Sequence, residues 1–167
     1  KVGLILDAFA KVKQNYDAHL IIGGEGNRKK MLLKKARQYG LEKDITFIGF
    51  IHHQTELPQL YQMADVFVTA STIETQGIVD LEAMASSLPI LAPNAGALPE
   101  LVKDGLNGYL FKPDDTDDFA AKLTLILTNP STAKRMGEQS LAFVAQHEVS
   151  LSIDRFEHIY FHLLKPL

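Results

Sequence analysis

Two glutamates, Glu74 and Glu82, have the residue type and spacing in this chain that most clearly predict a chemical role. Glu74 precedes a turn at Gly77, and the residues after that glycine have the pattern of a helix that contains Glu82. The first turn of a helix offers free backbone N–H groups and the positive end of its dipole to an anion. Carboxylates on either side can accept hydrogen bonds from hydroxyls. A ligand with hydroxyls on both sides of phosphate fits, and a nucleotide sugar is such a ligand.

The two carboxylates could in principle act as a general acid and a general base. Glycosidases use carboxylates about 5–9.5 Å apart that face one open cleft. Glu74 and Glu82 are separated by roughly 9 Å of helix rise with the helix N-terminus between them, which favours binding of a long ligand over paired proton transfer. Spacing alone also permits a simpler interpretation, in which Glu74 is a solvated loop acid and Glu82 an exposed helix residue.

The composition is that of one globular domain large enough to bury a core. The 167 residues include 17 basic and 20 acidic side chains, a balance that argues against a general nucleic-acid binder. There is no cysteine, so the chain has neither disulfides nor a thiolate metal site, and we expect a cytoplasmic protein. No apolar run approaches the roughly 18–20 residues that span a bilayer, and no signal peptide is visible.

The glutamate pair must be positioned by the elements around it, and the rest of the sequence predicts a regular alternation of strands and helices. Short apolar runs predict strands at residues 19–23, 45–48, 65–69, 89–92 and 108–111. Helical spacing predicts helices at residues 1–15, 27–39, 56–64, 77–86, 99–102, 116–128, 131–146 and 150–164. On the last helix an apolar stripe predicts packing against the core, through Phe156, Ile159, Tyr160, Leu163 and Leu164.

This alternation, with short connections and no hairpin signal, predicts parallel strands joined by right-handed crossovers. The expected fold is a doubly wound, Rossmann-like α/β domain. Ligands in such folds bind outside the carboxyl ends of the strands. The loops at residues 23–26, 49–53, 71–77 and 93–98 all follow predicted strands. We therefore expect them to share one edge of the sheet and to form the site together.

The segment around the glutamates resembles a known family. Ser71-Thr-Ile-Glu74-Thr-Gln-Gly77-Ile-Val-Asp-Leu-Glu82-Ala-Met-Ala-Ser-Ser-Leu-Pro89 is similar to the E-x7-E signature of the retaining GT-B glycosyltransferases of the group 1 type. The resemblance continues, in order, through Ile21-Ile-Gly-Gly24-Glu-Gly26, Ile45-Thr-Phe-Ile-Gly49-Phe-Ile51, Leu57-Pro-Gln-Leu-Tyr61, Ala64-Asp-Val-Phe-Val68, Gly96-Ala-Leu-Pro-Glu-Leu-Val102 and Asp104-Gly-Leu-Asn-Gly108. It implies that residues 1–167 are a single nucleotide-sugar-binding domain, the C-terminal half of a GT-B enzyme. We expect a fragment whose N-terminal acceptor domain and first strand lie outside this chain, and the resemblance also implies that the last helix can pack toward that domain.

The resemblance also implies roles for individual residues. Glu74 would hold hydroxyls of the donor sugar as the catalytic residue, and Glu82 would hold the ribose hydroxyls. Backbone N–H groups of residues 76–78 would face the sugar and the diphosphate and stabilise charge on the leaving group. Ile51 would contact the base through its backbone, and Lys1 stands where the family keeps a phosphate-binding lysine. The implied donor-binding residues are Lys1, Gly24, Gly26, Ile51, Thr75, Gln76, Gly77, Ile78 and Glu82, with no metal ligand.

The implied activity is transfer of a hexose from a nucleoside diphosphate sugar to an acceptor hydroxyl, on a lipid or another sugar, without a metal or other cofactor. The run Thr75-Gln76-Gly77 resembles members that use UDP-glucose. Two other classes remain open as alternatives. A nucleotide-sugar epimerase of the same fold is one, although the E-x7-E pattern argues against it. A receiver-type regulatory module is the other, but it needs acids at strand carboxyl ends, and Asp65 stands at the start of its predicted strand.

Four further features carry expectations that depend on the fold. Ser87 and Ala97 stand where the family has glycine, and Ser87 would cost stability if its backbone is left-handed.

The helix at 27–39 is basic, so it is either a solvated face or a contact for anionic lipid headgroups at the inner face of a membrane. Its basic residues are Arg28, Lys29, Lys30, Lys34, Lys35 and Arg37, and we expect Met31, Leu32 and Ala36 in the core. The pairs His52/His53 and His158/His162 lack the further ligands of a metal site, so we expect none.

Overall fold

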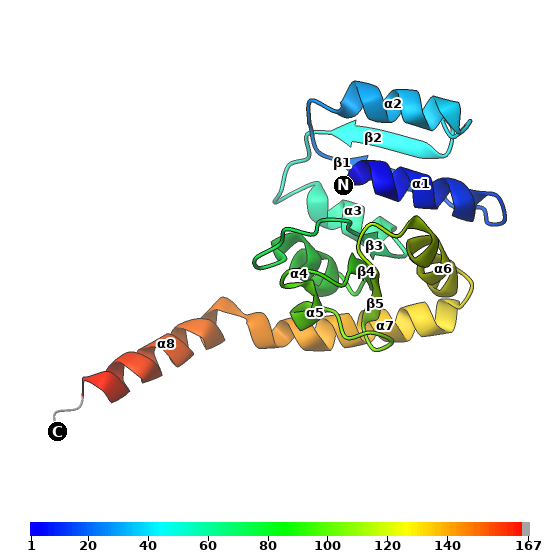
Figure 1. Ribbon diagram of the computed structural model, residues 1–167. Helices are drawn as coiled ribbons and strands as arrows, with labels where there is room; N and C mark the ends of the chain where they lie inside the picture. The colour runs from blue at the N-terminus through cyan, green and yellow to red at the C-terminus, as the bar shows by residue number, and fades with distance from the viewer. Residues whose placement is uncertain (165–167) are drawn as a thin grey trace.

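A computed structural model describes residues 1–164 and shows helices alternating with short parallel strands (Figure 1). The helices are α1 (Val2–Lys13), α2 (Lys29–Gln38), α3 (Leu57–Met63), α4 (Ile78–Ala85), α5 (Leu98–Leu101), α6 (Thr116–Leu127), α7 (Pro130–Val144) and α8 (Val149–Leu163), with a 3-10 turn η1 (Ala145–His147). The strands are β1 (Leu20–Gly23), β2 (Ile45–Gly49), β3 (Phe67–Val68), β4 (Ile90–Pro93) and β5 (Gly108–Phe111). Every predicted strand is present, and the predicted α/β class is confirmed.

The strands form two parallel sheets, where the sequence predicted one. β1 pairs with β2, with Leu20 opposite Ile45, and β4 lies between β3 and β5, with Ile90 opposite Gly108. Between the β1 and β3 edges lies a cavity of about 780 Å³. Its walls include apolar residues of β1, β3 and α1, namely Leu20, Ile21, Ile22, Phe67, Val68, Val2, Ile5 and Phe9. Strand order is a property of pairing between distant segments, which local periodicity does not specify.

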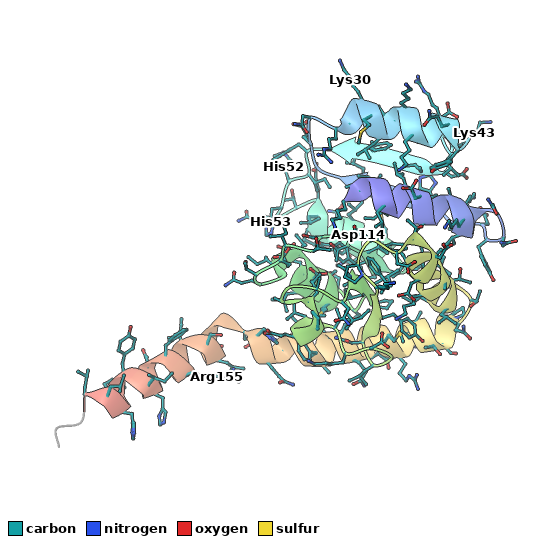
Figure 2. All side chains as sticks on the ribbon, viewed as in Figure 1. Lys30, Lys43, His52, His53, Asp114 and Arg155 are labelled. Carbon is teal, nitrogen blue, oxygen red and sulfur yellow. The ribbon has the colours of Figure 1, made fainter. Side chains whose placement is uncertain are left out.

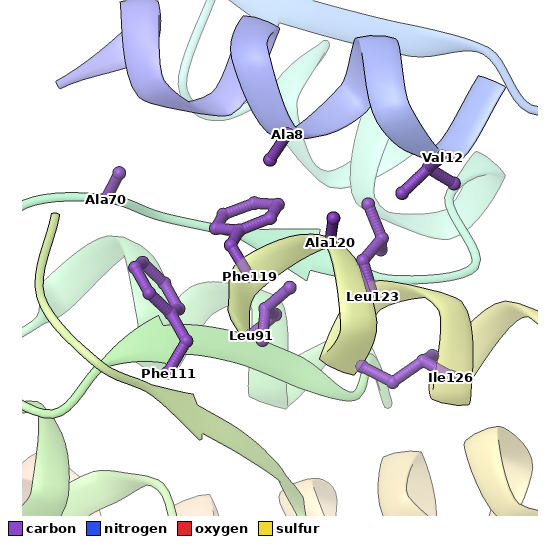
Figure 3. Packing of buried hydrophobic residues seen from close by; sticks show 9 residues of the cluster. All are labelled: Ala8, Val12, Ala70, Leu91, Phe111, Phe119, Ala120, Leu123 and Ile126. Carbon is purple, nitrogen blue, oxygen red and sulfur yellow. The ribbon is translucent and has the colours of Figure 1, made fainter. Parts of the chain in front are cut away.

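The three-stranded sheet has a buried cluster on each face. Successive residues of a strand point to opposite faces, so Leu91 contacts one cluster while Ile90 and Ala92 contact the other. The first cluster joins the sheet to α1 and α6, and Phe111 and Phe119 meet in it edge to face with ring centroids 4.8 Å apart (Figure 3). The second lies under α4 and α5 and includes Tyr61, Met84, Leu98 and Leu101. These clusters fix the helices that carry the predicted site.

The predicted core role of the last helix is wrong. α8 leaves the body of the molecule, and Figure 1 shows it extending away from the other elements. Its apolar stripe is exposed, with Phe156 at 64% and Tyr160 at 65% of full accessibility. Periodicity shows that a helix has an apolar face, but the partner of that face is set by how the helix is attached to the rest of the fold. Among the residues that the structure describes, no helix is both long enough and apolar enough to cross a membrane.

Two smaller expectations have mixed outcomes. On α2, Leu32 and Ala36 are buried as predicted, but Met31 is 53% exposed, so its placement in the core was wrong. Ser87 has φ of 59° at the turn after α4, which is the left-handed backbone at which we expect a serine in place of glycine to cost stability. Its carbonyl oxygen packs on α7, where a Cβ on Gly137 would stand 2.0 Å away.

Candidate functional site

The loop between β3 and α4 folds the side chain of Glu74 back over the start of the helix. Its Oε1 accepts hydrogen bonds from the N–H groups of Gly77 at 3.1 Å and Thr75 at 3.2 Å. The backbone N–H of Gly77, and then those of Gln76 and Thr75, lower the pKa of the Glu74 carboxyl. Glu74 is therefore an ionised acceptor at the helix start. The Gly77 N–H, predicted to face a ligand, here donates to Glu74.

Gly77 makes the sharp entry into α4 possible. It is the N-cap with φ of 64°, and a Cβ there would stand 2.5 Å from a methyl of Leu101. The first N–H groups of a helix have no partner within the helix, and the dipole adds positive potential at the same point. Thr75, Gln76 and Ile78 are exposed around this turn. The sequence-predicted residues of this segment thus surround a helix start that can bind an anion.

The loop after β4 holds the backbone of Glu74 in place. The Ala97 N–H donates to the carbonyl oxygen of Glu74 at 3.0 Å. Gly96 has φ of 58°, and a Cβ there would lie 2.7 Å from the same oxygen, so only glycine allows this approach. Ala97 itself has ordinary right-handed helical angles, which explains why a residue other than glycine fits. The sequence indicated Gly96 as part of a motif but not as a support for Glu74.

Glu82 on α4 is held by two side chains that the sequence did not connect with it. Its Oε1 lies 2.6 Å from His53 Nε2, and its Oε2 accepts a hydrogen bond from the Tyr61 hydroxyl at 3.2 Å. Figure 2 shows His53 on the loop that leads from β2 to α3, on the side of the molecule where α4 lies. Burial, and then the nearby Glu82 carboxylate, raise the pKa of the Tyr61 hydroxyl. Within residues 1–164 no group of three or more His, Cys, Asp or Glu side chains is arranged to hold a metal ion.

The first turn of α4 carries a buried carboxyl. Asp80 is 1% exposed, and neither of its side-chain oxygens has a hydrogen-bond partner in the described part of the chain. Burial and, secondly, the negative charge of Glu74 raise the pKa of Asp80 to about 7. A Cβ on Gly77 would lie 3.3 Å from Asp80 Oδ2. Asp80 carries no local signal in the sequence, because only the packing of α4 removes it from water.

The other predicted donor-binding residues lie in two further places. Gly24 has φ of 102°, and its N–H donates to the carbonyl of Gly49 at 2.7 Å, which ties together the loops after β1 and β2. Ile51 packs on this turn, and Gly26 lies next to it with open space around its Cα. Lys1 forms an ion pair of 2.7 Å with Asp114, in the loop after β5. Lys1, Gly24 and Ile51 also line the cavity between β1 and β3.

The chain is similar in sequence to known proteins over most of its length. A family model described as "Glycosyl transferases group 1" matches residues 1–142. The chain is 29% identical over 162 residues to N-acetyl-alpha-D-glucosaminyl L-malate synthase of Bacillus anthracis, a match over 96% of this chain and 42% of that protein. It is 35% identical over 130 residues to alpha-monoglucosyldiacylglycerol synthase of Acholeplasma laidlawii, over 77% of this chain and 32% of that protein. The chain thus spans less than half the length of these relatives.

Solved structures agree in fold. The C-terminal domain of a glycosyl transferase group 1 family protein (LpcC) from Francisella tularensis aligns with TM-score 0.81 and 33% identity, over 89% of this chain and 80% of that one. HepE of Anabaena in complex with UDP-glucose aligns with TM-score 0.83 and 26% identity, over 96% of this chain and 44% of that one.

Proposed function

Since the chain belongs to the family of glycosyl transferases group 1, we propose that it is the donor-binding domain of a retaining glycosyltransferase. The parent enzyme would move a hexose from a nucleoside diphosphate sugar to an acceptor hydroxyl. The observation that carries this proposal is the arrangement of Glu74 and Glu82 around the glycine-started helix α4. The retaining outcome is inferred from the resemblance of this segment to the E-x7-E signature.

The donor would lie across the N-terminus of α4. The free N–H groups and the dipole of the helix would face the diphosphate and stabilise the charge that develops as the diphosphate leaves. Glu74 would accept hydrogen bonds from hydroxyls of the hexose. In the described residues its Oε2 makes no hydrogen bond, so this oxygen is available. Because the helix start supplies positive potential at the diphosphate, we propose that the reaction needs no metal ion.

Glu82 would bind the ribose, and Ile51 would contact the base from the loop after β2. UDP-glucose is the favoured donor, since Thr75-Gln76-Gly77 resembles members that use it. Two relatives support this choice: HepE of Anabaena has been solved with UDP-glucose, and the Acholeplasma relative is named a monoglucosyldiacylglycerol synthase. GDP-mannose and UDP-N-acetylglucosamine are the alternatives to be compared with it.

The acceptor would bind on an N-terminal domain, and the domain described here would hold one further strand, the first of its sheet. The cavity between β1 and β3 supports the proposal of this further strand, because it is lined by apolar residues of two strand edges. A parallel strand placed there would join the two sheets into one, and α1 would then be the right-handed crossover that connects it to β1. The acceptor class, a lipid or another sugar, is part of the proposal for the whole enzyme.

Donor binding is the direct test of this function. We expect UDP-glucose to bind to the protein in a calorimetric titration, and we expect Glu82→Ala and Glu74→Ala each to weaken binding about tenfold or more, since each removes a charged hydrogen-bond acceptor. Glu138→Ala, on the exposed face of α7, is the matched control and should bind as the wild type does. Equal affinity of wild type and Glu82→Ala for the preferred donor would overturn the ribose assignment.

We also propose that the outer face of α2 contacts an anionic membrane surface. Lys30, Lys34 and Arg37 share this exposed face, and Figure 2 shows Lys30 pointing away from the molecule. Lys35 points inward instead and pairs with Asp7 at 2.6 Å. The chain as a whole has a net charge of −3, so positive charge is concentrated on this helix. Exposed Met31 could enter the headgroup region beside these cations.

Vesicle sedimentation tests the membrane contact. We expect the protein to bind vesicles rich in phosphatidylglycerol but not pure phosphatidylcholine, and we expect the double change Lys30→Gln and Lys34→Gln to abolish binding. The control is Lys134→Gln with Arg135→Gln, an equal loss of charge from α7. Equal loss of binding in both double variants would show that only net charge matters and would refute a role for α2.

A further inference from the structure

We propose that His53 and Tyr61 are positioning residues for Glu82, and that they set the preference of the site for a nucleotide whose ribose carries both hydroxyls. This inference rests on the proposed function, because it takes Glu82 as the ribose-binding carboxylate. It adds two residues that contact the carboxylate rather than the nucleotide, and it assigns them a role in sugar discrimination.

The geometry fixes both oxygens of the Glu82 carboxylate. His53 Nε2 lies 2.6 Å from Oε1, and the Tyr61 hydroxyl donates to Oε2 at 3.2 Å. A carboxylate has about four lone-pair positions and can accept two parallel hydrogen bonds. Each oxygen therefore keeps one position for a further donor. The remaining two positions match the two adjacent hydroxyls of a ribose, provided that the carboxylate plane does not rotate.

Tyr61 anchors this arrangement to the core. Its side chain is 8% exposed and packs edge to face against Phe67 of β3, with ring centroids 5.8 Å apart. The hydroxyl also lies 3.4 Å from the carbonyl oxygen of Val79, on the same helix as Glu82. The ring position is therefore set by β3 and the hydroxyl by α4. This contact ties the orientation of the Glu82 carboxylate to the sheet.

His53 provides the second support, through the other oxygen of the Glu82 carboxylate. Its side chain is 72% exposed, whereas that of Glu82 is 23% exposed. A polar contact to a side chain this exposed contributes little to stability, so the fold does not depend on it. The loop that carries His53 is itself held, because the His52 N–H donates to Glu56 at 2.9 Å and the His52 carbonyl accepts from the N–H of Glu56 at 2.9 Å.

The same loop carries Ile51, the residue proposed to contact the base. Only one residue separates Ile51 from His53, so the base contact and the support of Glu82 lie on one short segment. A nucleotide that seats its base on this loop would therefore find the ribose acceptor already oriented. Loss of His53 should free the Glu82 carboxylate to rotate without removing any group that contacts the nucleotide.

The test compares UDP with 2′-deoxy-UDP by calorimetric titration of the protein. The ratio of the two dissociation constants measures ribose recognition, and a general loss of fold or of phosphate binding leaves this ratio unchanged. In the wild type we expect UDP to bind about tenfold more tightly than 2′-deoxy-UDP. His53→Ala and Tyr61→Phe should each reduce the ratio about threefold or more, and His53→Gln, which keeps an N–H donor, should restore most of it.

Two further variants make the outcome decisive. Glu82→Gln should bring the ratio of the two dissociation constants to about one. His162→Gln, on the exposed α8, should leave the ratio at its wild-type value. If His53→Ala and Tyr61→Phe keep the wild-type ratio while Glu82→Gln loses it, the positioning inference is wrong and the proposed function stands. If the wild type binds none of UDP, GDP or ADP, the proposed function itself fails and this inference with it. Should Tyr61→Phe not fold, the two His53 variants still decide.

Discussion

The buried carboxyl of Asp80 should make the stability of this protein fall as the pH rises. The pKa of Asp80 is raised to about 7 from an ordinary value of 3.8 by burial and by the charge of Glu74. The folded protein therefore holds this proton more tightly than the unfolded chain does. Below about pH 4 Asp80 is protonated in both states, so it does not change the free energy of unfolding with pH. Between about pH 4 and pH 7 the free energy of unfolding falls. Above about pH 7 Asp80 is ionised in both states, and the full loss of stability is present.

The size of the penalty follows from the two pKa values. At about 1.4 kcal/mol for each pH unit, the difference between 3.8 and about 7 corresponds to roughly 4 kcal/mol. This is a large fraction of the about 5–15 kcal/mol that stabilises a typical domain. Asp80→Asn keeps the shape of the side chain but cannot ionise. The cost of burying the asparagine amide is the same at every pH. Any change with pH in the stability difference between the variant and the wild type therefore comes from ionisation of the Asp80 carboxyl.

Urea unfolding followed by far-UV circular dichroism at pH 5, 6, 7 and 8 measures this effect, and it suits a chain without tryptophan. The stability of Asp80→Asn relative to wild type should rise by a few kcal/mol across this range. Asp65→Asn, at an exposed position, is the matched control and should follow the wild type. Parallel pH profiles for the wild type and Asp80→Asn would refute the reasoning, because they would show that Asp80 has the same proton affinity in both states.

Four other substitutions test the packing of the molecule. Ser87→Gly should raise the free energy of unfolding by about 1 kcal/mol, because glycine removes the strain of the left-handed backbone at φ of 59°; the urea midpoint reports it. Gly96→Ala should lower the free energy of unfolding by roughly 2 kcal/mol and weaken UDP binding, since its Cβ would meet the Glu74 carbonyl at 2.7 Å. Unchanged affinity for UDP would show that the loop carrying Gly96 does not support the binding site. Phe119→Ala, in the core, should lower the free energy of unfolding by about 3–5 kcal/mol. Phe156→Ala, on exposed α8, should lower it by less than about 0.5 kcal/mol. Similar shifts in melting temperature for the two variants would contradict the described packing.

The order of the elements could be predicted because each one has a local signal. Apolar runs marked the strands, and glycines marked turns such as those at Gly40 and Gly77, both of which have positive φ. These local signals did not predict which element a helix face packs against or which strands pair with each other. The stripe on α8 has helical period, yet it is exposed, and the division of the strands into two sheets left no trace in local periodicity.

The sequence by itself determined the segment from Glu74 to Glu82, because a loop acid, a left-handed glycine and a helix residue at fixed spacing are local features of one short stretch. Only the tertiary structure decided what surrounds that segment. His53 meets Glu82 across 29 positions of chain, and Gly96 reaches the backbone of Glu74, through the packing of α3, α4 and the strand loops. Asp80 has the same side chain as any exposed aspartate, and its raised pKa arises first from burial on the inner face of α4 and then from the charge of Glu74. Contacts between distant residues and loss of solvent are properties of the packed molecule, so spacing along the chain could not specify them.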